Sequence, residues 1–178
     1  MKGDFTPMSE DYKEIIEIVK QQEEALVFDD FSQDDSLQLG LKIIETVLAE
    51  YQKGVSVRIE LNGITVFSHL MGRAGLGNEW WMRKKMNACQ KYGTSSFRAY
   101  LEIEYAGKLD QYPWAANQGN YALRGGCFPI QVKGEGTVGY AMVSGLPQAN
   151  DHQLVADSIA KLLGKGIPTV LGGMEFIP

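Results

Sequence analysis

The sequence contains only two cysteines, Cys89 and Cys127, and neither belongs to a paired motif such as C-x-x-C. This spacing gives no disulfide framework and no cysteine zinc site, so we expect two reduced, buried thiols and no bound metal. No apolar run approaches the roughly 18 residues that a membrane-spanning helix needs, and residues 1–7 do not resemble a secretory signal. We therefore expect a cytoplasmic protein that does not contact a membrane.

Basic residues are also in the minority. The chain has 17 Lys and Arg against 22 Asp and Glu, for a formal net charge of -5. A general nucleic-acid binder needs a basic face for phosphate contacts, so that class is disfavoured. With 44% hydrophobic and 22% charged residues over 178 positions, the composition is typical of a globular protein. We expect residues 1–178 to form a single domain with a helical pair at the N-terminus and a tail at the C-terminus.

No recognised catalytic signature is present: the sequence shows no Ser-His-Asp order, no phosphate-binding loop and no metal-ligand spacing. The most informative segment is residues 121–163. It predicts a glycine turn, a strand, a Gly134-Glu135-Gly136 turn, a second strand, a Ser144-Gly145 loop and an amphipathic helix. Several backbone amides and a helix N-terminus would then converge on one small-ligand site.

Two amphipathic helices are predicted first. Ser9 is a suitable cap for a helix running to about Val27, and residues 34–36 offer a cap for the second. Helical spacing gives each an apolar stripe, expected to pack on a sheet: Tyr12, Ile15, Ile16, Val19 and Leu26 in the first, and Leu37, Leu41, Ile44, Leu48 and Tyr51 in the second.

The sheet is expected to begin with a hairpin. Residues 55–61 alternate between apolar and polar side chains, and Asn62-Gly63 is a strong signal for a two-residue turn. Such a turn pairs Ile59 with Val66 and places His69 beside Ser56, away from the apolar face.

A third helix is predicted over residues 78–92, and alternation predicts another strand over residues 97–105. With the strands of residues 121–163 these elements make an α+β fold with about five strands in a mainly antiparallel sheet. Residues 107–119 form a loop long enough to cover a pocket or contact a neighbour.

Several candidate ligand-binding residues lie on the third helix. Arg83 and Lys84 are near its start, where free amides favour an anion, but a solvated charged face explains them equally well. Lys85 falls in the apolar sector, where a lysine usually extends to the edge, and its other interpretation is a cation in a pocket. The neighbouring Trp80, Trp81, Met82 and Met86 are better explained by core packing than by a cofactor.

The other candidates flank the last helix and the preceding strands. Asp151 can cap the helix, and His152 can project toward whatever the Ser144-Gly145 loop holds. The other interpretation, slightly favoured, is that Asn150 or Asp151 only caps the helix and that His152 is solvated. Arg124 precedes Gly125 and Gly126 and has a planar donor group suited to carboxylate or phosphate. In an antiparallel pair, this turn and Ser144 lie at the same end of the sheet.

Several motifs together resemble a known family: Trp81-Met82-Arg83-Lys84-Lys85 with Asn87, Gly125-Gly126-Cys127-Phe128-Pro129-Ile130, Gly136-Thr137-Val138-Gly139, Val143-Ser144-Gly145-Leu146-Pro147-Gln148 and Asp151-His152. They are similar to the HbpS-like or GlcG-like superfamily, in the branch called haem-degrading domain proteins. The resemblance spans nearly the whole chain. It implies a profilin-like or PAS-like α-β-α arrangement, with a five-stranded antiparallel sheet flanked by helices, in subunits that assemble into dimers and larger rings.

The resemblance also implies a ligand, because some relatives bind haem or iron, and haem is therefore a candidate cofactor. Relatives commonly carry a histidine before the paired glycines, whereas this chain has Arg124. A guanidinium does not ligate iron, but it suits an anion, including the propionates of haem.

Three functions from different classes remain open. The favoured one is an oligomeric protein that binds a small anion or cofactor through Arg83, Lys84, Arg124, Gly125, Gly126, Ser144, Gly145, Asp151 and His152. The second is a haem-degrading or hydrolytic enzyme with His152 as acid or base and Asp151 beside it. The third is an interaction module whose acidic N-terminal helix and tail (residues 166–178) dock on another protein. Because the tail stays apolar to its end, we expect at least a homodimer.

Overall fold

A computed structural model describes residues 9–108 and 119–171, and its strands form one five-stranded sheet. The elements follow in the order α1 (Ser9–Ala25), β1 (Val27–Phe28), α2 (Gln33–Glu50), β2 (Ser56–Leu61), β3 (Ile64–Leu70), α3 (Leu76–Tyr92), α4 (Ser96–Tyr105), β4 (Cys127–Val132), β5 (Gly136–Ser144) and α5 (Gln148–Leu163). The strand order is β1-β4-β5-β2-β3. The predicted α+β class is confirmed, but the sheet is mixed because β1 runs parallel to β4.

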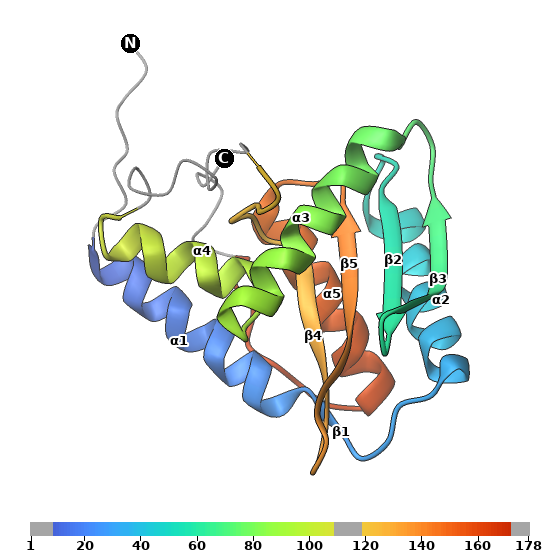
Figure 1. Ribbon diagram of the computed structural model, residues 1–178, viewed down its shortest axis with the longest axis horizontal. Coiled ribbons are helices and arrows are strands. Elements are labelled where there is room, and N and C mark those ends of the chain that lie inside the picture. Colours follow the sequence, from blue (N-terminus) through green and yellow to red (C-terminus); the bar gives the residue numbers. More distant parts are fainter. Residues whose placement is uncertain (1–8, 109–118, 172–178) are drawn as a thin grey trace.

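Helices cover both faces of this sheet (Figure 1). Helices α2 and α5 pack on one face and α3 on the other, while α1 and α4 pack together beyond the β1 and β4 side. The largest apolar cluster lies between the sheet, α2 and α5, with Ile43, Ile59 and Ile159 fully buried. Between α3 and the sheet the packing includes both cysteines, which are free and buried. Within the described ranges, no helix combines the length and apolar character required to cross a membrane.

The hairpin of β2 and β3 has the predicted turn but a different register. Leu61 pairs with Ile64 as expected, and a bulge at Val66 then shifts the pairing so that Ile59 lies opposite Phe67. Val57 consequently pairs with His69, which places His69 on the same side of the sheet as Val57. The predicted face of His69 is therefore wrong, because one extra residue in a strand reverses the side on which later residues lie.

Helix α2 begins one residue before the predicted cap region and buries a different stripe. Ser32 is the cap: its hydroxyl accepts from the Asp35 N–H, and the Asp35 carboxylate accepts from the Ser32 N–H. The core face contains Leu39, Ile43 and Val47. The predicted stripe is wrong, because three of its residues, Leu37, Leu41 and Leu48, are exposed.

Residues 97–105 form helix α4 and not the predicted strand. The Ser95 hydroxyl accepts from the Arg98 N–H, and Arg98 pairs with Glu102 one turn further on. The buried side chains Phe97, Tyr100 and Leu101 follow helical spacing. The sheet still has five strands, because β1 forms the fifth strand in place of the one predicted at residues 97–105. β1 begins where the first helix was expected to end. The predicted loop at 107–119 lies mostly outside the described residues.

Candidate functional site

A hollow lies at the end of the sheet where β4 begins and β5 ends. Cys127 pairs with Met142 there, and the Val143 N–H donates to the Gly126 carbonyl at 2.7 Å. As predicted from the antiparallel arrangement, the glycine turn and Ser144 therefore lie at the same end. The hollow, named here the α5 hollow, has a volume of about 310 Å³ and is lined by Asn78, Trp81, Lys85, Arg124, Ser144, Gly145, Leu146, Pro147, Gln148 and Asp151.

A buried ion pair forms the base of the α5 hollow. The Lys85 ammonium lies 2.9 Å from an Asp151 carboxylate oxygen and donates to the Val143 carbonyl at 3.1 Å. Only 3% of Lys85 and 2% of Asp151 is exposed. Of the two interpretations of Lys85, the structure supports the cation in a pocket, because its side chain does not extend to the solvent at the edge.

Asp151 organises the loop between β5 and α5. Its carboxylate accepts from the Leu146 N–H at 3.0 Å and from the Gly145 N–H at 3.4 Å. Burial raises the pKa of Asp151, and the Lys85 ammonium and these two N–H groups offset part of that rise. The predicted capping role is corrected, because the N-cap of α5 is Pro147 and Asp151 reaches back to the loop from the end of the first helical turn.

The paired glycines let the backbone of the β4 turn approach this ion pair closely. Gly126 has a φ of +121°, and a Cβ there would stand 2.7 Å from the Lys85 Nζ and 3.0 Å from the Asp151 Cβ. At Gly125 a Cβ would collide with the Gln148 carbonyl oxygen. Both glycines are thus required by the space around Lys85 and Gln148, although neither has a side chain to bind a ligand.

Arg124 places a second positive charge at the rim of the α5 hollow. Its guanidinium donates to the Leu123 carbonyl at 3.0 Å and lies 5.4 Å from the centre of the Tyr100 ring. These two contacts hold one side of the planar group and leave other N–H donors of the guanidinium for a ligand. With Lys85 and Asp151, the hollow has two cations and one carboxylate, a net charge of +1.

Further donors face the same space. An ammonium has three N–H bonds, and Lys85 uses two of them on Asp151 and Val143. Helix α5 begins at the wall of the hollow, and its N-cap residue, Pro147, makes no side-chain hydrogen bond to the first amides. A helix N-terminus carries a partial positive charge and binds anions. The arrangement is suited to hold a small carboxylate or phosphate, with the Trp81 indole beside it.

His152 does not line the α5 hollow, contrary to the prediction. It is fully buried, 4.9 Å from the Phe97 ring, and its Nε2 lies 2.8 Å from the Gln22 Oε1. Since the Gln22 Nε2 donates to Gln153 and Pro168, the Gln22 oxygen is the acceptor and the His152 Nε2 carries the proton. Burial lowers the pKa of His152 to about 3, so the ring is neutral.

The same network holds the described part of the tail. Gln22 of α1 bonds to the Pro168 carbonyl, and the Gln153 Oε1 of α5 accepts from the Val170 N–H. The tail therefore packs on its own subunit as far as residue 171, and the rest of the predicted docking segment lies outside the described residues. No local pattern in the sequence indicates that His152 belongs to this network, because its partner is 130 residues away.

Arg83 and Lys84 are separated from the other predicted residues. They line a second hollow, named here the α3 groove, of about 510 Å³, together with Arg58, Leu76, Glu79, Trp80, Asn87 and Asn120. Arg58 forms an ion pair with Glu79 there. Trp80, expected in the core, is 61% exposed. Thus Arg124, Ser144, Gly145 and Asp151 meet in one hollow, and Arg83 and Lys84 belong to another.

Sequence reasoning missed Asn78, Trp81 and Gln148 as parts of the site. Asn78 donates to the Ser144 carbonyl at 3.0 Å, and the Gln148 Oε1 accepts from the Gly125 N–H at 3.2 Å. One signal was available, since Asn78, Trp81 and Lys85 recur at helical spacing on one side of α3.

A further hollow of about 410 Å³ lies at the far end of β4. Arg98 of α4 lines this hollow, and it is already paired with Glu23. Across the described ranges, no group of three His, Cys, Asp or Glu side chains is placed to hold a metal ion.

Comparison with known proteins gives consistent matches. The family model described as "Haem degrading protein HbpS-like" matches residues 31–160. A UPF0303 protein of Brucella anthropi is 34% identical over 156 residues, which cover 88% of this chain and 92% of the relative. The solved structure of Ybr137w protein has a TM-score of 0.73 at 24% identity, covering 84% of this chain and 87% of that one. The PduOC:Heme complex has a TM-score of 0.61 at 20% identity, covering 78% and 97%.

Proposed function

Because the chain belongs to the family of HbpS-like haem degrading proteins, we propose that it binds a small anionic molecule in the α5 hollow. The observation that carries this proposal is the buried Lys85 ammonium, which keeps one N–H for the same space that Arg124 and the start of α5 border. A volume of about 310 Å³ favours a ligand at the small end of the usual range. The net charge of +1 favours a monoanion such as a monocarboxylate.

The site selects its ligand through the fixed position of the ammonium. Asp151 and the Val143 carbonyl hold Lys85 from two sides, so little side-chain entropy remains to be lost when a ligand binds. Burial strengthens the electrostatic attraction, because the ammonium is shielded from water. Arg124 then supplies N–H donors at the rim for a second oxygen of the ligand.

Haem is the second candidate, and the membership in the haem degrading family and the likeness to the PduOC:Heme complex favour it. The described residues that line the α5 hollow do not fit direct ligation of its iron, since they include no His, Met, Cys or Tyr. His152 is bonded to Gln22 inside the core, and His69 is exposed on β3. Haem at this site would be held by its carboxylates alone. The same position of His152 removes the support for an enzyme that uses it as acid or base.

Thermal unfolding with a ligand panel tests both candidates. The probes are acetate, benzoate, inorganic phosphate and hemin, each up to millimolar concentration and each with wild type, Arg124→Gln and Arg83→Gln. A ligand at 100 times its Kd stabilises the fold by about 2.7 kcal/mol. We expect a rise in Tm with a monocarboxylate that is lost in Arg124→Gln and kept in Arg83→Gln.

Absence of a shift with every probe would contradict the proposal. A rise in Tm with hemin alone, accompanied by a Soret spectrum of histidine-ligated iron, would contradict the proposal in two ways. It would show that the ligand is not a small carboxylate, and that a histidine of this chain does ligate the haem iron. A homo-oligomeric assembly is part of the proposed function.

A further inference from the structure

The α5 hollow holds a primary amine in contact with a carboxylate. The Lys85 ammonium lies 2.9 Å from an oxygen of Asp151, and both residues line the hollow. A lysine nitrogen attacks carbonyl carbons once it has lost its proton, and a neighbouring base activates it. Of its two acceptors, the Val143 carbonyl only accepts a hydrogen bond, whereas a carboxylate also takes up a proton. Asp151 is therefore the base that is in contact with Lys85.

The loop before α5 holds this carboxylate in place. The Leu146 N–H donates to one oxygen at 3.0 Å, and the Gly145 N–H donates at 3.4 Å to the oxygen that Lys85 contacts. Burial raises the pKa of Asp151, which lowers the cost of protonating it. The pair is thus arranged to pass a proton from nitrogen to oxygen and back.

The turn before β4 is shaped around the Lys85 nitrogen. A Cβ at Gly126 would stand 2.7 Å from that nitrogen, so any side chain at this position would displace it. The ammonium uses two of its three N–H bonds inside the protein and keeps the third for the hollow. After one proton has moved to Asp151, rotation about the Cε–Nζ bond turns the nitrogen lone pair toward the hollow. The nitrogen is then placed to react with a bound ligand.

Arg124 limits which carbonyl compounds use both cations. It lines the same hollow of about 310 Å³ as Lys85, so a ligand whose carboxylate binds the guanidinium presents its adjacent carbon to the amine. A carbonyl group at that adjacent carbon defines a 2-oxo acid. A carbonyl compound without a carboxylate leaves Arg124 unused, and a dicarboxylate exceeds the net charge of +1 in the hollow. Small 2-oxo acids with one carboxylate are the class that fits.

We infer that Lys85 forms an iminium with the carbonyl carbon of a small 2-oxo acid, an inference that rests on the proposed binding of an anion in the α5 hollow. Asp151 takes a proton from the ammonium, the neutral nitrogen bonds to the carbonyl carbon, and a second proton moves from nitrogen to the carbonyl oxygen. Asp151 then returns its proton to that oxygen, which leaves as water while the C=N bond forms. One ammonium and one 2-oxo acid thus give one iminium and one water, with no oxidant or reductant.

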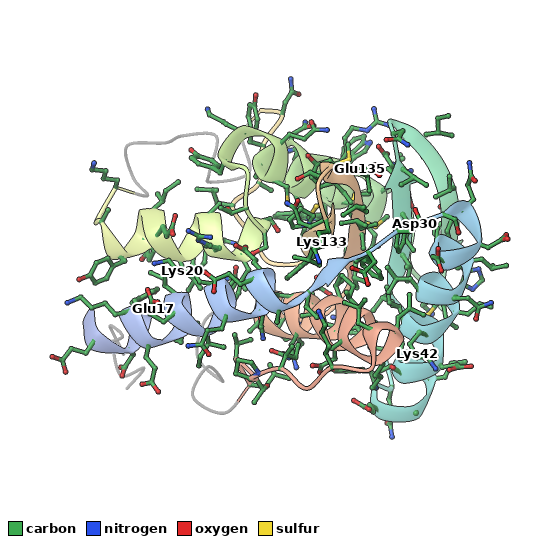
Figure 2. All side chains as sticks on the ribbon, turned by 90° about the horizontal axis from the view of Figure 1, so that it is seen from below. Glu17, Lys20, Asp30, Lys42, Lys133 and Glu135 are labelled. Carbon is green, nitrogen blue, oxygen red and sulfur yellow. The ribbon has the colours of Figure 1, made fainter. Side chains whose placement is uncertain are left out.

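Reductive trapping of the purified full chain tests this step. Cyanoborohydride converts an iminium into a stable secondary amine, which peptide mass spectrometry then locates. We expect an adduct on Lys85 with pyruvate and none with lactate, which has the carboxylate but no carbonyl. Figure 2 shows the comparison residue Lys133, which is exposed at the turn between β4 and β5, the end of these strands opposite to the α5 hollow. Labelling of Lys85 should exceed that of Lys133 at least about tenfold, because a bound ligand reacts at a high effective concentration.

Three variants assign the reaction to the α5 hollow. Lys85→Arg keeps a positive charge beside Asp151 but has no amine, so the adduct at this position should disappear. Lys84→Arg is the matched control, since Lys84 is the preceding residue of α3 and lines the α3 groove, and it should keep the labelling of Lys85. Arg124→Gln removes the partner of the carboxylate and should slow the labelling about 10-fold or more.

Thermal unfolding with pyruvate, in the absence of reductant, separates this step from the binding of an anion. A rise in Tm without an adduct on Lys85 would overturn the iminium and leave anion binding intact. Absence of both would contradict the two together. Equal labelling of Lys85 and Lys133 in the wild type would also overturn the iminium at this site, and that comparison does not depend on the folding of any variant.

Discussion

The α5 hollow and the α3 groove lie along two sides of the same helix, and both contain cations, but they differ in how these are held. In the α5 hollow the ammonium of Lys85 is buried and fixed between a carboxylate and a carbonyl. In the α3 groove, Arg83 is exposed, and a tryptophan beside it is largely open to solvent. Positive charge along the sequence thus marks both places, and the α5 hollow differs in that its ammonium is almost fully buried between its two acceptors.

Removing the anchor of the α5 hollow should have the largest effect. Asp151→Ala leaves Lys85 buried without its counter-charge and deprives the Gly145 and Leu146 N–H groups of their acceptor. Breaking a buried ion pair in this way costs about 3 to 5 kcal/mol. Urea unfolding should show this loss. A loss below about 1 kcal/mol would mean that the ion pair does not organise the loop.

The two histidines differ in the same way, since His152 is buried and His69 is exposed. The pKa of His152 is about 3 when folded and about 6.5 when unfolded. Below pH 6.5 the unfolded chain therefore binds a proton that the folded chain does not, so this group lowers stability by about 1.4 kcal/mol per pH unit as the pH falls toward 3.

Urea unfolding between pH 7 and 5 measures this slope. The variant His152→Gln should lose it, and His69→Gln should keep it, since His69 lies exposed on the edge strand. Asp151, whose pKa is raised by burial, is present in all three proteins, so its contribution cancels from the comparison. An unchanged slope in His152→Gln would show that His152 is not held neutral in the core.

Exchange of one arginine in each hollow separates them as ligand sites. Arg124→Gln removes a charge-assisted hydrogen bond, worth about 1.5 to 3 kcal/mol, which corresponds to about 10-fold to 150-fold weaker binding. Arg83→Gln should change the Kd less than about threefold, because its net charge change is screened at the surface. Calorimetry with the carboxylate identified by the thermal panel measures both. Equal losses would show that the ligand also contacts the α3 groove.

The smallest effect is expected at the ion pair of the α3 groove. Glu79→Gln removes the partner of Arg58, but Glu60 lies 3.9 Å from the same guanidinium and retains part of the attraction. We expect a loss of about 1 kcal/mol. Urea unfolding beside Asp151→Ala gives the direct comparison, and an equal loss in both would mean that the two ion pairs are anchored alike.

Much of the region around the site could be predicted from local sequence. The Asn62-Gly63 turn, the two strands after Arg124 and the last helix follow from turn residues and periodicity that act within a few positions. Residues 97–105 show where this reasoning fails. Their alternation suits a strand, but the Ser95 cap and the Arg98–Glu102 pair favour a helix, and packing against α1 and α3 agrees with the helix.

The sequence by itself determined which segments had to bury a face, and it determined the glycine turn that the site requires, since these depend on residue type and short spacing. The tertiary structure alone decided which of the two apolar stripes of α2 faces the sheet, which histidine is buried in the core, and which lysine meets Asp151. Those outcomes depend on partners many residues away, such as the 66 positions between Lys85 and Asp151. Only the packing of α3, β5 and α5 brings such groups within hydrogen-bond distance.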